Sequence, residues 1–355
     1  MTNLVTLRDL AKAAKVSHMT VSRALRNAPG INGQTRERIL HVAARLGYRS
    51  NPFVSAWMAN RRTVRKLECS STIAFINSFQ DQALWKRRAS FTRFVQGARR
   101  RADTLGFQLE EFRLAGPGMS SQRLSEILYA RGIQGVIVGS LAEANGQLQL
   151  EWDRFAAAAQ GYSLNLPRLH CSCNNYFKTT LLALRELRLL GYRRIGFAMS
   201  AAVNARGGQL WTGAFAAYQQ EIPAKMRISG FIPDSWTKTA FLKWFLKTRP
   251  DAILTCHVDI PGYLADAGIR VPEDVGVAQT DWHPEYAGWS GVDQNVEVAG
   301  ANAVDLVAAQ LLNNERGIPE SPKVVLTDGA WVKGITTRVV GRPAPVRARS
   351  TLLQE

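Results

Sequence analysis

The stretch Ala14-Lys-Val-Ser-His-Met-Thr-Val-Ser-Arg-Ala-Leu-Arg-Asn27 (AKVSHMTVSRALRN) decides the fold of the N-terminal region. Ser17 is a good N-cap, because its hydroxyl can accept a hydrogen bond from a free backbone N–H of the next turn. In the helix that then begins at His18, the apolar and the polar residues fall on opposite sides. We expect one side to pack (Val21, Ala24 and Leu25) and the other to face solvent (His18, Met19, Ser22, Arg23 and Arg26).

A capping box precedes this helix, and a third helix follows it. In Thr6-Leu-Arg-Asp9 the Thr hydroxyl can accept from the N–H of Asp9 while the carboxylate reaches back, so a first helix starts directly after Thr6. A turn at Lys15-Val16 separates it from the second helix. Asn32 can cap a third helix that ends at Gly47, a residue that accepts the left-handed conformation. Both helices carry an inward apolar stripe: Leu7, Leu10, Ala11 and Ala14 in the first, and Ile39, Val42, Ala43 and Leu46 in the third.

The chain is strongly basic, and the surplus lies mainly at the N-terminus. Of 355 residues, 45 are Lys or Arg and 28 are Asp or Glu, which gives a formal net charge of +17. The first 66 residues hold thirteen of the basic residues and two acidic ones. Such a segment is drawn to polyanions, to nucleic acid before anionic membrane. Its ordered apolar spacing argues against a disordered basic tail.

Two helices joined by a short turn, the second with a short-polar and basic side, are typical of a helix-turn-helix. In that motif the second helix enters the DNA major groove with its first residues on base edges. The alternative is a three-helix unit that merely exposes its charge. The coincidence of caps, turn length, apolar stripe and basic surplus favours DNA binding.

Three segments resemble the DNA-binding domain of the LacI/GalR (lactose/galactose repressor) family: Thr6-Leu-Arg-Asp-Leu-Ala-Lys-Ala-Ala-Lys-Val-Ser-His-Met-Thr-Val-Ser-Arg-Ala-Leu25, Thr35-Arg-Glu-Arg-Ile39 and Leu46-Gly-Tyr48. The resemblance runs through nearly the whole chain. It implies an all-α helix-turn-helix domain at 1–50 and a hinge helix with linker at 51–70. An α/β two-lobed, periplasmic-binding-protein-like domain with parallel sheets follows at 71–340, and a disordered tail at 341–355.

The resemblance also implies roles in DNA recognition. Hydroxyl residues match positions that contact or orient phosphates, whereas His18, Met19 and Arg23 match base-reading positions. Arg23 would supply bidentate hydrogen bonds, most often to guanine. The variable pair His18 and Met19 would set the operator sequence. The predicted DNA-binding residues are Thr6, Ser17, His18, Met19, Thr20, Ser22, Arg23, Thr35, Tyr48, Asn51 and Trp57.

The segment Tyr48-Arg-Ser-Asn-Pro-Phe-Val-Ser-Ala-Trp-Met-Ala-Asn-Arg61 resembles the family's hinge helix, which orders when two copies pair in the DNA minor groove. Asn51 is suited to cap this helix, with Pro52 in its first turn. The family usually has Leu where Trp57 stands and Pro where Ser50 stands. Three interpretations stay open: Trp57 intercalates as a larger wedge, Met58 takes that role, or Trp57 is an ordinary packing residue.

From residue 70 onward, short apolar runs alternate with amphipathic stretches, which predicts parallel strands with helical crossovers. A helical stripe runs from Phe91 to Leu105, and a long helix is expected at about Val296–Leu312. The strand candidates are Thr72–Ile76, Phe107–Phe112, Gly135–Val138, Ile195–Met199, Ala252–Thr255 and Val275–Ala278.

Ligands of open parallel sheets collect at the carboxyl ends of the strands. With the family's two-lobed fold, this predicts an effector cleft between the lobes. Arg and Asp around an aromatic ring suit a polyhydroxylated ligand, because donors and acceptors grip hydroxyls while the ring covers an apolar face. The candidate effector-binding residues are Ser78, Phe79, Arg206, Asp259, Asp281, Trp282 and Gln294.

Several departures from the family keep a second ligand class open. Val258 replaces the Asn that commonly precedes Asp259, the usual Asn-Pro-Phe-Phe after the first strand is absent, and Arg206 is displaced by one or two positions. A sugar or sugar derivative is expected first, and a purine or other non-sugar effector is the alternative. His257 and His283 are expected to be neutral polar side chains.

The sequence shows neither a secretory signal at its start nor a membrane-spanning run. Met1–Thr6 lacks a basic n-region with an apolar run behind it, and no stretch of about 18 apolar residues occurs. We therefore expect a cytoplasmic protein with reduced thiols at Cys69, Cys171, Cys173 and Cys256. Cys171-Ser-Cys173 beside His170 lacks a second ligand pair at zinc spacing, so neither metal nor cofactor is expected.

These patterns together predict a homodimeric, ligand-controlled transcription regulator, a repressor rather than an activator, on a palindromic operator in double-stranded DNA. The tail from Gly341 has two prolines and no apolar heptad, which favours a dimer over a tetramer. An enzyme is disfavoured, because neither GxGxxG, GxxxxGK[ST] nor GxSxG occurs. A pure solute-binding protein is disfavoured by residues 1–66.

Overall fold

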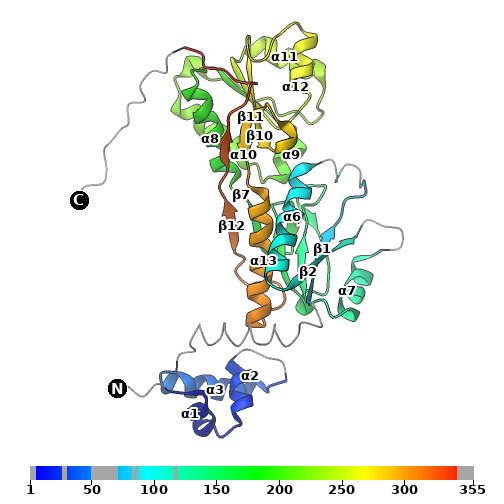
Figure 1. Ribbon diagram of the computed structural model, residues 1–355, viewed down its shortest axis with the longest axis vertical. Helices are drawn as coiled ribbons and strands as arrows, with labels where there is room; N and C mark the ends of the chain where they lie inside the picture. Colours follow the sequence, from blue (N-terminus) through cyan, green and yellow to red (C-terminus); the bar gives the residue numbers. More distant parts are fainter. Residues whose placement is uncertain are drawn as a thin grey trace, which may run out of the picture.

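The computed structural model describes residues 5–25, 30–48, 71–81, 85, 88–114 and 119–341. The N-terminal domain consists of α1 (Leu7–Ala13), α2 (His18–Leu25) and α3 (Gly33–Arg45), drawn in blue in Figure 1. All three helices begin where the caps predicted. Their buried residues form one small core: Leu10, Ala14, Val21, Ala24, Ile39, Val42 and Ala43.

Side-chain caps fix the start of each helix. The Thr6 N–H donates to the Asp9 carboxylate at 2.8 Å, and the Asp9 N–H donates back to the Thr6 hydroxyl at 3.4 Å. The Thr20 N–H donates to the Ser17 hydroxyl at 3.0 Å. Between the two helices Lys15 adopts a φ of +51°, which places the turn where it was expected.

Beyond the N-terminal domain the chain forms two lobes, each built on its own sheet. The N-lobe sheet has the order β12-β7-β5-β3-β1-β2, with all neighbours parallel. Its strands are β1 (Ser71–Asn77), β2 (Phe107–Arg113), β3 (Gly135–Val138), β5 (Ala156–Gln160), β7 (His170–Asn174) and β12 (Val324–Thr327). A two-stranded sheet of β4 (Gly146–Gln147) and β6 (Leu164–Leu166) lies apart from it.

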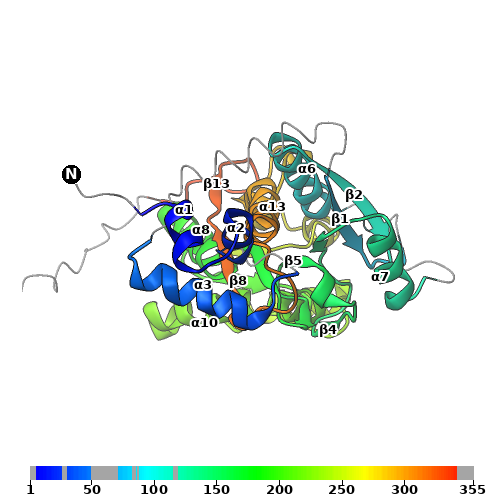
Figure 2. The same cartoon turned by 90° about the horizontal axis from the view of Figure 1, so that it is seen from below.

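Helices cover both faces of the N-lobe sheet. One face carries α6 (Ala89–Thr104) and α13 (Val296–Asn313), which pack on Phe75 and Ile137. The other carries α7 (Ser121–Ala130), whose Leu124 and Leu128 pack on Ile76. The view from below shows α6 and α7 on opposite sides of β1 and β2 (Figure 2). Because helices cover both faces of this sheet, its central strand β3 (GVIV) is buried and apolar along its whole length.

The C-lobe sheet has the order β13-β11-β10-β9-β8, parallel except for β13. Its strands are β8 (Ile195–Ala198), β9 (Ala252–Thr255), β10 (Gly276–Trp282), β11 (Ser290–Asp293) and β13 (Ala330–Val332). Two helices, α8 (Tyr176–Leu189) and α10 (Leu210–Glu221), cover one face. The other face carries α11 (Lys238–Thr248) and α12 (Ile260–Asp266), and the short α9 (Ala201–Arg206) follows β8.

The chain passes between the lobes three times: from β7 to α8, from β11 to α13 and from β12 to β13. Side-chain amides tie the three passages together. The Asn174 amide donates to the carbonyls of Gln294 (3.0 Å) and Thr327 (2.9 Å), and the Asn295 amide donates to the carbonyl of Asp328 at 2.8 Å. Each lobe is therefore assembled from separated parts of the sequence.

All six predicted strands and the long helix are present, and the fold class is confirmed. Some boundaries needed correction: β8 ends at Ala198 rather than Met199, β10 runs from Gly276 to Trp282 rather than Val275 to Ala278, and α13 continues to Asn313. The sequence analysis missed β5, β7 and β11, as well as the short and edge strands. Their sequences AAAAQ, HCSCN and SGVD lack the β-branched runs that mark a strand.

Candidate DNA-binding and effector sites

The polar side of α2 faces outward, as its spacing predicts. His18 and Arg23 are exposed, and the Met19 side chain is 66% exposed. Thr20 and Ser22 are half-buried, and Ser17 caps the helix from an exposed position. Val21 and Ala24 are buried on the opposite side, so the core holds the helix with His18 and Met19 presented at its first turn.

The other predicted DNA-binding residues surround this helix. The Thr6 hydroxyl donates to the Asp9 carboxylate at 2.7 Å, and this bond lowers the pKa of Asp9. Thr35 is half-buried in the first turn of α3. Tyr48 packs against the domain core, and burial raises the pKa of its hydroxyl. Asn51, Trp57 and Met58 lie outside the described residues.

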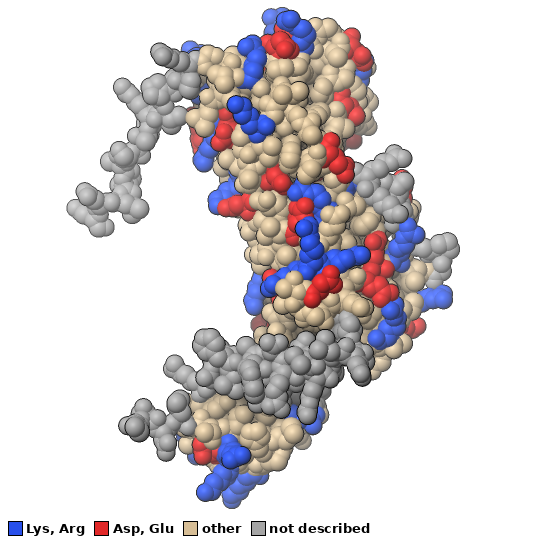
Figure 3. Space-filling view, in the orientation of Figure 1, with Lys and Arg blue, Asp and Glu red and all other residues tan. Residues whose placement is uncertain are grey.

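The N-terminal domain exposes its basic residues. Its described acidic residues are Asp9 and Glu37, whereas six exposed basic side chains are distributed over its surface: Arg8, Lys12, Lys15, Arg23, Arg38 and Arg45. Figure 3 shows part of this basic surface at the bottom of the view. The N-terminal domain therefore carries the positive charge that binding to a phosphate backbone requires.

In the two-lobed domain, most predicted effector residues lie at strand ends. Ser78 follows β1, Asp281 and Trp282 end β10, and Arg206 ends α9; all four are half-buried. Asp259 precedes α12 and is exposed. Ser78, Asp281 and Trp282 thus lie at the carboxyl ends of parallel strands, whereas Arg206 lies at the end of a helix.

Two predicted effector residues have other contacts. Phe79 packs inside the N-lobe, where its side chain is 3% exposed and its ring centroid lies 5.1 Å from that of Phe91. Gln294 is buried at a passage between the lobes, where its amide donates to the Thr280 carbonyl at 2.7 Å. Phe79 thus belongs to a core and Gln294 to the joint between the lobes.

Asp281 has the most perturbed carboxylate of the site. Burial raises its pKa to about 6, although a hydrogen bond with Ser90 and the positive charge of Arg93 lower it. Both of these residues belong to α6 of the N-lobe, whereas Asp281 belongs to the C-lobe. The carboxylate therefore lies where the two lobes meet.

The positive charge of Arg88, a residue of the N-lobe, acts on Arg206 of the C-lobe. Burial lowers the pKa of its guanidinium, and the positive charge of Arg88 lowers it further. Arg88 is the residue before α6, and its guanidinium carbon lies 5.7 Å from the ring centroid of Phe91.

The sequence patterns did not single out the aromatic residues Tyr176, Trp211 and Trp236. The Tyr176 and Trp211 ring centroids lie 4.1 Å apart, and the Trp236 ring stacks on His257 at 3.5 Å with an interplanar angle of 8°. Among the described residues, the buried indole N–H groups of Trp211, Trp236 and Trp282 have no hydrogen-bond partner. Rings of this kind suit the apolar face of a small ligand.

Cys256 and His257 directly follow β9. This position at the end of a strand is the signal in the sequence that could have identified them as candidate site residues. Burial raises the pKa of the Cys256 thiol to about 12 and lowers the pKa of His257 to about 4. The Ser200 N–H donates to Nε2 of His257 at 3.1 Å, which requires a neutral imidazole there. Both side chains are therefore uncharged at neutral pH.

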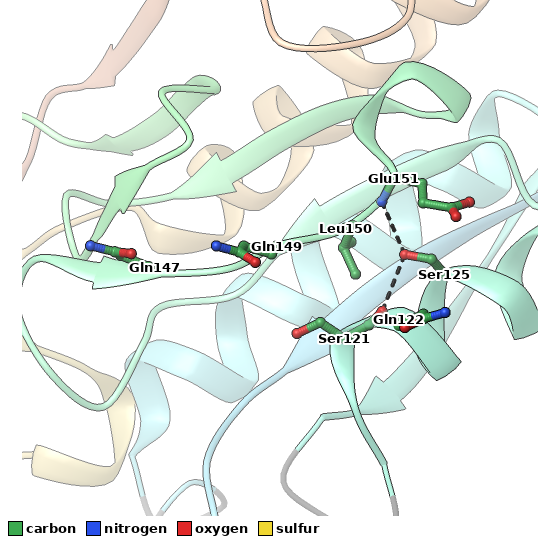
Figure 4. A pocket seen from close by; sticks show the side chains of 7 residues that line it. All are labelled: Ser121, Gln122, Ser125, Gln147, Gln149, Leu150 and Glu151. Atoms are coloured by element: carbon green, nitrogen blue, oxygen red, sulfur yellow. Dashed lines mark hydrogen bonds between the residues drawn. The ribbon is translucent and has the colours of Figure 1, made fainter.

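A separate polar pocket of about 470 Å³ lies on the N-lobe beside the start of α7 (Figure 4). The Ser125 hydroxyl donates to the Ser121 carbonyl at 3.1 Å and accepts from the Glu151 N–H at 3.1 Å. Gln122, Gln147 and Gln149 also line it. It contains none of the predicted effector residues.

Within the described ranges, no group of three or more His, Cys, Asp or Glu residues is placed to hold a metal ion. The same residues contain no helix long and apolar enough to cross a membrane.

An exposed recognition helix in a basic three-helix domain, followed by two α/β lobes with a polar and aromatic site where they meet, defines an effector-responsive transcriptional regulator. Residues 6–51 match the model of bacterial regulatory proteins of the lacI family, and residues 184–337 match that of the periplasmic binding protein-like domain. The chain therefore combines a DNA-binding domain of the lacI family with a periplasmic-binding-protein-like domain.

Individual proteins agree with this assignment. A protein named probable HTH-type transcriptional repressor ExuR, from Bacillus subtilis, is 52% identical over 48 residues, which is 14% of each chain. Among solved structures, a lac repressor dimer bound to operator and an anti-inducer superimposes with a TM-score of 0.56 at 19% identity, covering 95% of this chain and 100% of that one. The transcriptional regulator CelR in complex with cellobiose gives 0.54 at 19% identity, covering 94% and 99%.

Proposed function

We propose that this protein is a repressor that binds a palindromic operator as a homodimer and is controlled by a small carbohydrate. The observation that carries the DNA-binding part is the outward surface of α2, where His18, Met19 and Arg23 are exposed at the start of a helix fixed by a buried core. ExuR carries repressor in its name, and the lac repressor dimer is bound to operator; both support the same role here. We propose the cytoplasm as its location, because its relatives of this kind act on bacterial chromosomal DNA.

The arrangement at the lobe boundary supports a carbohydrate effector. Asp281 offers acceptor oxygens and Arg206 offers a fork of donors, which together match the hydroxyl groups of a sugar. The Trp236–His257 stack and the Tyr176–Trp211 pair offer flat apolar surfaces. The cellobiose complex of CelR supports this class of ligand.

A ligand at the boundary between the lobes would control DNA binding by changing how the lobes are arranged. Because Asp281 belongs to the C-lobe and its partners Ser90 and Arg93 to the N-lobe, a ligand bound there changes how the lobes meet. In a dimer this moves the two N-lobes, to which the DNA-binding domains connect. The coupling free energy between effector and DNA is reciprocal, typically about 1–3 kcal/mol.

The test is to select operators from fragmented genomic DNA with the full-length protein and to footprint the selected fragments. We expect a protected inverted repeat with half-sites one or more helical turns apart. Thermal shift against sugars, sugar acids and purines then identifies effectors, since a specific ligand raises stability by mass action. Protection without inverted symmetry would contradict the dimeric operator, and a purine as the sole hit would contradict the carbohydrate.

A further inference from the structure

One tyrosine of the N-lobe reaches an aromatic pair of the C-lobe. Tyr162 follows β5 through Gly161, whose φ of +68° turns the chain out of the sheet. In the C-lobe, Tyr176 and Trp211 pack on the core with their ring centroids 4.1 Å apart. The Tyr162 ring meets the Tyr176 ring edge-on, with centroids 6.2 Å apart and an interplanar angle of 61°. Such edge-to-face pairs attract, because the positive edge of one ring meets the negative face of the other.

The backbones of the two lobes also approach each other here. Gly208 of the C-lobe has a φ of +64°, and a Cβ on it would lie 3.7 Å from Cβ of Tyr162. A Cβ on Gly161 of the N-lobe would lie 3.8 Å from the hydroxyl oxygen of Tyr176. Both distances correspond to van der Waals contact. The aromatic contact is therefore supported by the chain on either side of it.

Each half of this contact is fixed within its own lobe. Trp211 is 8% exposed, and it packs so closely on Gly207 that a Cβ there would lie 1.9 Å from Cζ3 of the indole. In the N-lobe, a hydrogen bond links the Tyr162 hydroxyl to Cys173 of β7. Because neither half is free to follow the other, separating the lobes breaks the contact between Tyr162 and Tyr176.

The contact is also separate from the ion pairs that join the lobes. Arg93 connects α6 to Asp293 at the end of β11 and to Glu297 in α13. The aromatic contact instead connects the end of β5 to the starts of α8 and α10. Two links between different elements hold the relative orientation of the lobes more firmly than either does alone.

We infer that Tyr162, Tyr176 and Trp211 form an interlobe latch, which keeps the two lobes closed on each other in the ligand-free protein. A contact that exists in only one of two conformations favours that conformation. Loss of the Tyr162 ring therefore shifts the population towards the open arrangement. The latch depends on the contacts between the lobes and not on the identity of any effector.

Hydrogen exchange of the full-length protein, measured by mass spectrometry without ligand or DNA, tests the latch. Tyr162→Ala removes the ring, and Tyr162→Phe keeps the ring but loses the hydroxyl. Tyr129→Ala is the control, since Tyr129 belongs to the same lobe and is 62% exposed. We expect Tyr162→Ala to speed exchange about three- to tenfold at residues 207–213 of the opposite lobe, because an aromatic contact no longer opposes opening. Tyr162→Phe and the control should change exchange there by less than about twofold.

Trp211→Leu provides the reciprocal test from the C-lobe. It should speed exchange at residues 160–163 of the N-lobe, and this effect should disappear when Tyr162→Ala is already present, because the two residues act through one contact. Faster exchange confined to residues 160–163 after Tyr162→Ala would overturn the latch, as would additive effects of the two substitutions. If Trp211→Leu does not fold, equal exchange at residues 207–213 in Tyr162→Ala and Tyr162→Phe would overturn it, since the ring would then not join the lobes.

Discussion

The Arg93 guanidinium lies 3.2 Å from both carboxylate oxygens of Asp293 and so joins α6 of the N-lobe to the end of β11 in the C-lobe. The same side chain donates to Glu297 at 2.7 Å and to the Trp282 carbonyl at 3.4 Å. It is 13% exposed, which makes it the most buried arginine in the ion pairs of the described residues. One side chain thus connects both lobes beside Asp281.

Replacing this arginine should weaken the whole two-lobed domain. Arg93→Gln leaves Asp293 and Glu297 without their partner, and we expect the free energy of unfolding to fall by about 3 kcal/mol, as for other largely buried ion pairs. Arg101→Gln is the matched control, because Arg101 joins the same two helices through Asp305 with both side chains about 40% exposed (38% and 44%). Arg101→Gln should lower the free energy of unfolding by less than about 1 kcal/mol. Urea unfolding measures both, and equal losses would contradict a special role for Arg93.

The contact between α6 and α13 depends on two glycines. A Cβ on Gly97 would lie 2.0 Å from the Glu297 carbonyl oxygen, and one on Gly300 would lie 2.0 Å from the Phe94 carbonyl oxygen. Because these obstacles are backbone atoms, the helices must separate to admit a methyl group. We expect Gly97→Ala to destabilise the protein by about 1–3 kcal/mol, the usual cost of overpacking.

Gly213 provides the control for this substitution. It lies within α10 with open space around it, so Gly213→Ala should stabilise the protein by about 0.5–1 kcal/mol through helix propensity. Thermal melts of the two variants should shift in opposite directions. A neutral Gly97→Ala would show that the helix contact is adaptable.

The sequence predicted the elements that depend on interactions between residues close together in the chain. Thr6, Ser17 and Asn32 each start a helix through a bond to a residue two or three positions away, so the caps alone located the N-terminal helices. The clearest of the strands recognised in advance contain short apolar runs rich in β-branched or aromatic residues, as in Ile73–Ile76 and Val136–Val138. Strand β7 escaped notice because its polar residues are satisfied by distant partners: Ser172 donates to the Ala299 carbonyl and Asn174 to those of Gln294 and Thr327.

The candidate effector site was predictable only in part, because its residues come together only in the folded domain. Asp281 and Arg206 could be located from strand order and the family resemblance. Arg88, Ser90 and Trp211 come from segments whose spacing carries no sign of a site, and they approach Asp281 or Tyr176 only after the two lobes form. Phe79 was proposed for the site from its position after β1, and its ring packs against Phe91 in the N-lobe core.

The raised pKa of Asp281 should make the stability of the effector-free protein depend on pH. In the folded protein its pKa is about 6, above the ordinary 3.8 of an unfolded chain. As pH rises through this window, the unfolded chain loses the proton first, so the contribution of Asp281 to stability falls and then levels off above about pH 6.

Asp281→Asn removes this titration. The melting temperature of the variant minus that of the wild type should therefore increase from pH 4 to above pH 6 and then stay constant. Asp305→Asn is the control for losing a carboxylate at the surface, with a side chain 44% exposed. A difference between Asp281→Asn and the wild type that does not change with pH would show that folding does not raise the pKa of Asp281.

Arg23 tests whether the exposed surface of α2 reads DNA sequence. Arg23→Ala removes a fork of donors suited to a guanine edge, and we expect affinity for the selected operator to fall by about 1–3 kcal/mol. Affinity for unrelated duplex DNA should change much less, because many phosphate contacts contribute to this nonspecific affinity. Fluorescence anisotropy at fixed salt, with operator and scrambled duplexes, measures both. If the two affinities fell equally, Arg23 would be a phosphate contact, and base reading would have to come from His18 and Met19.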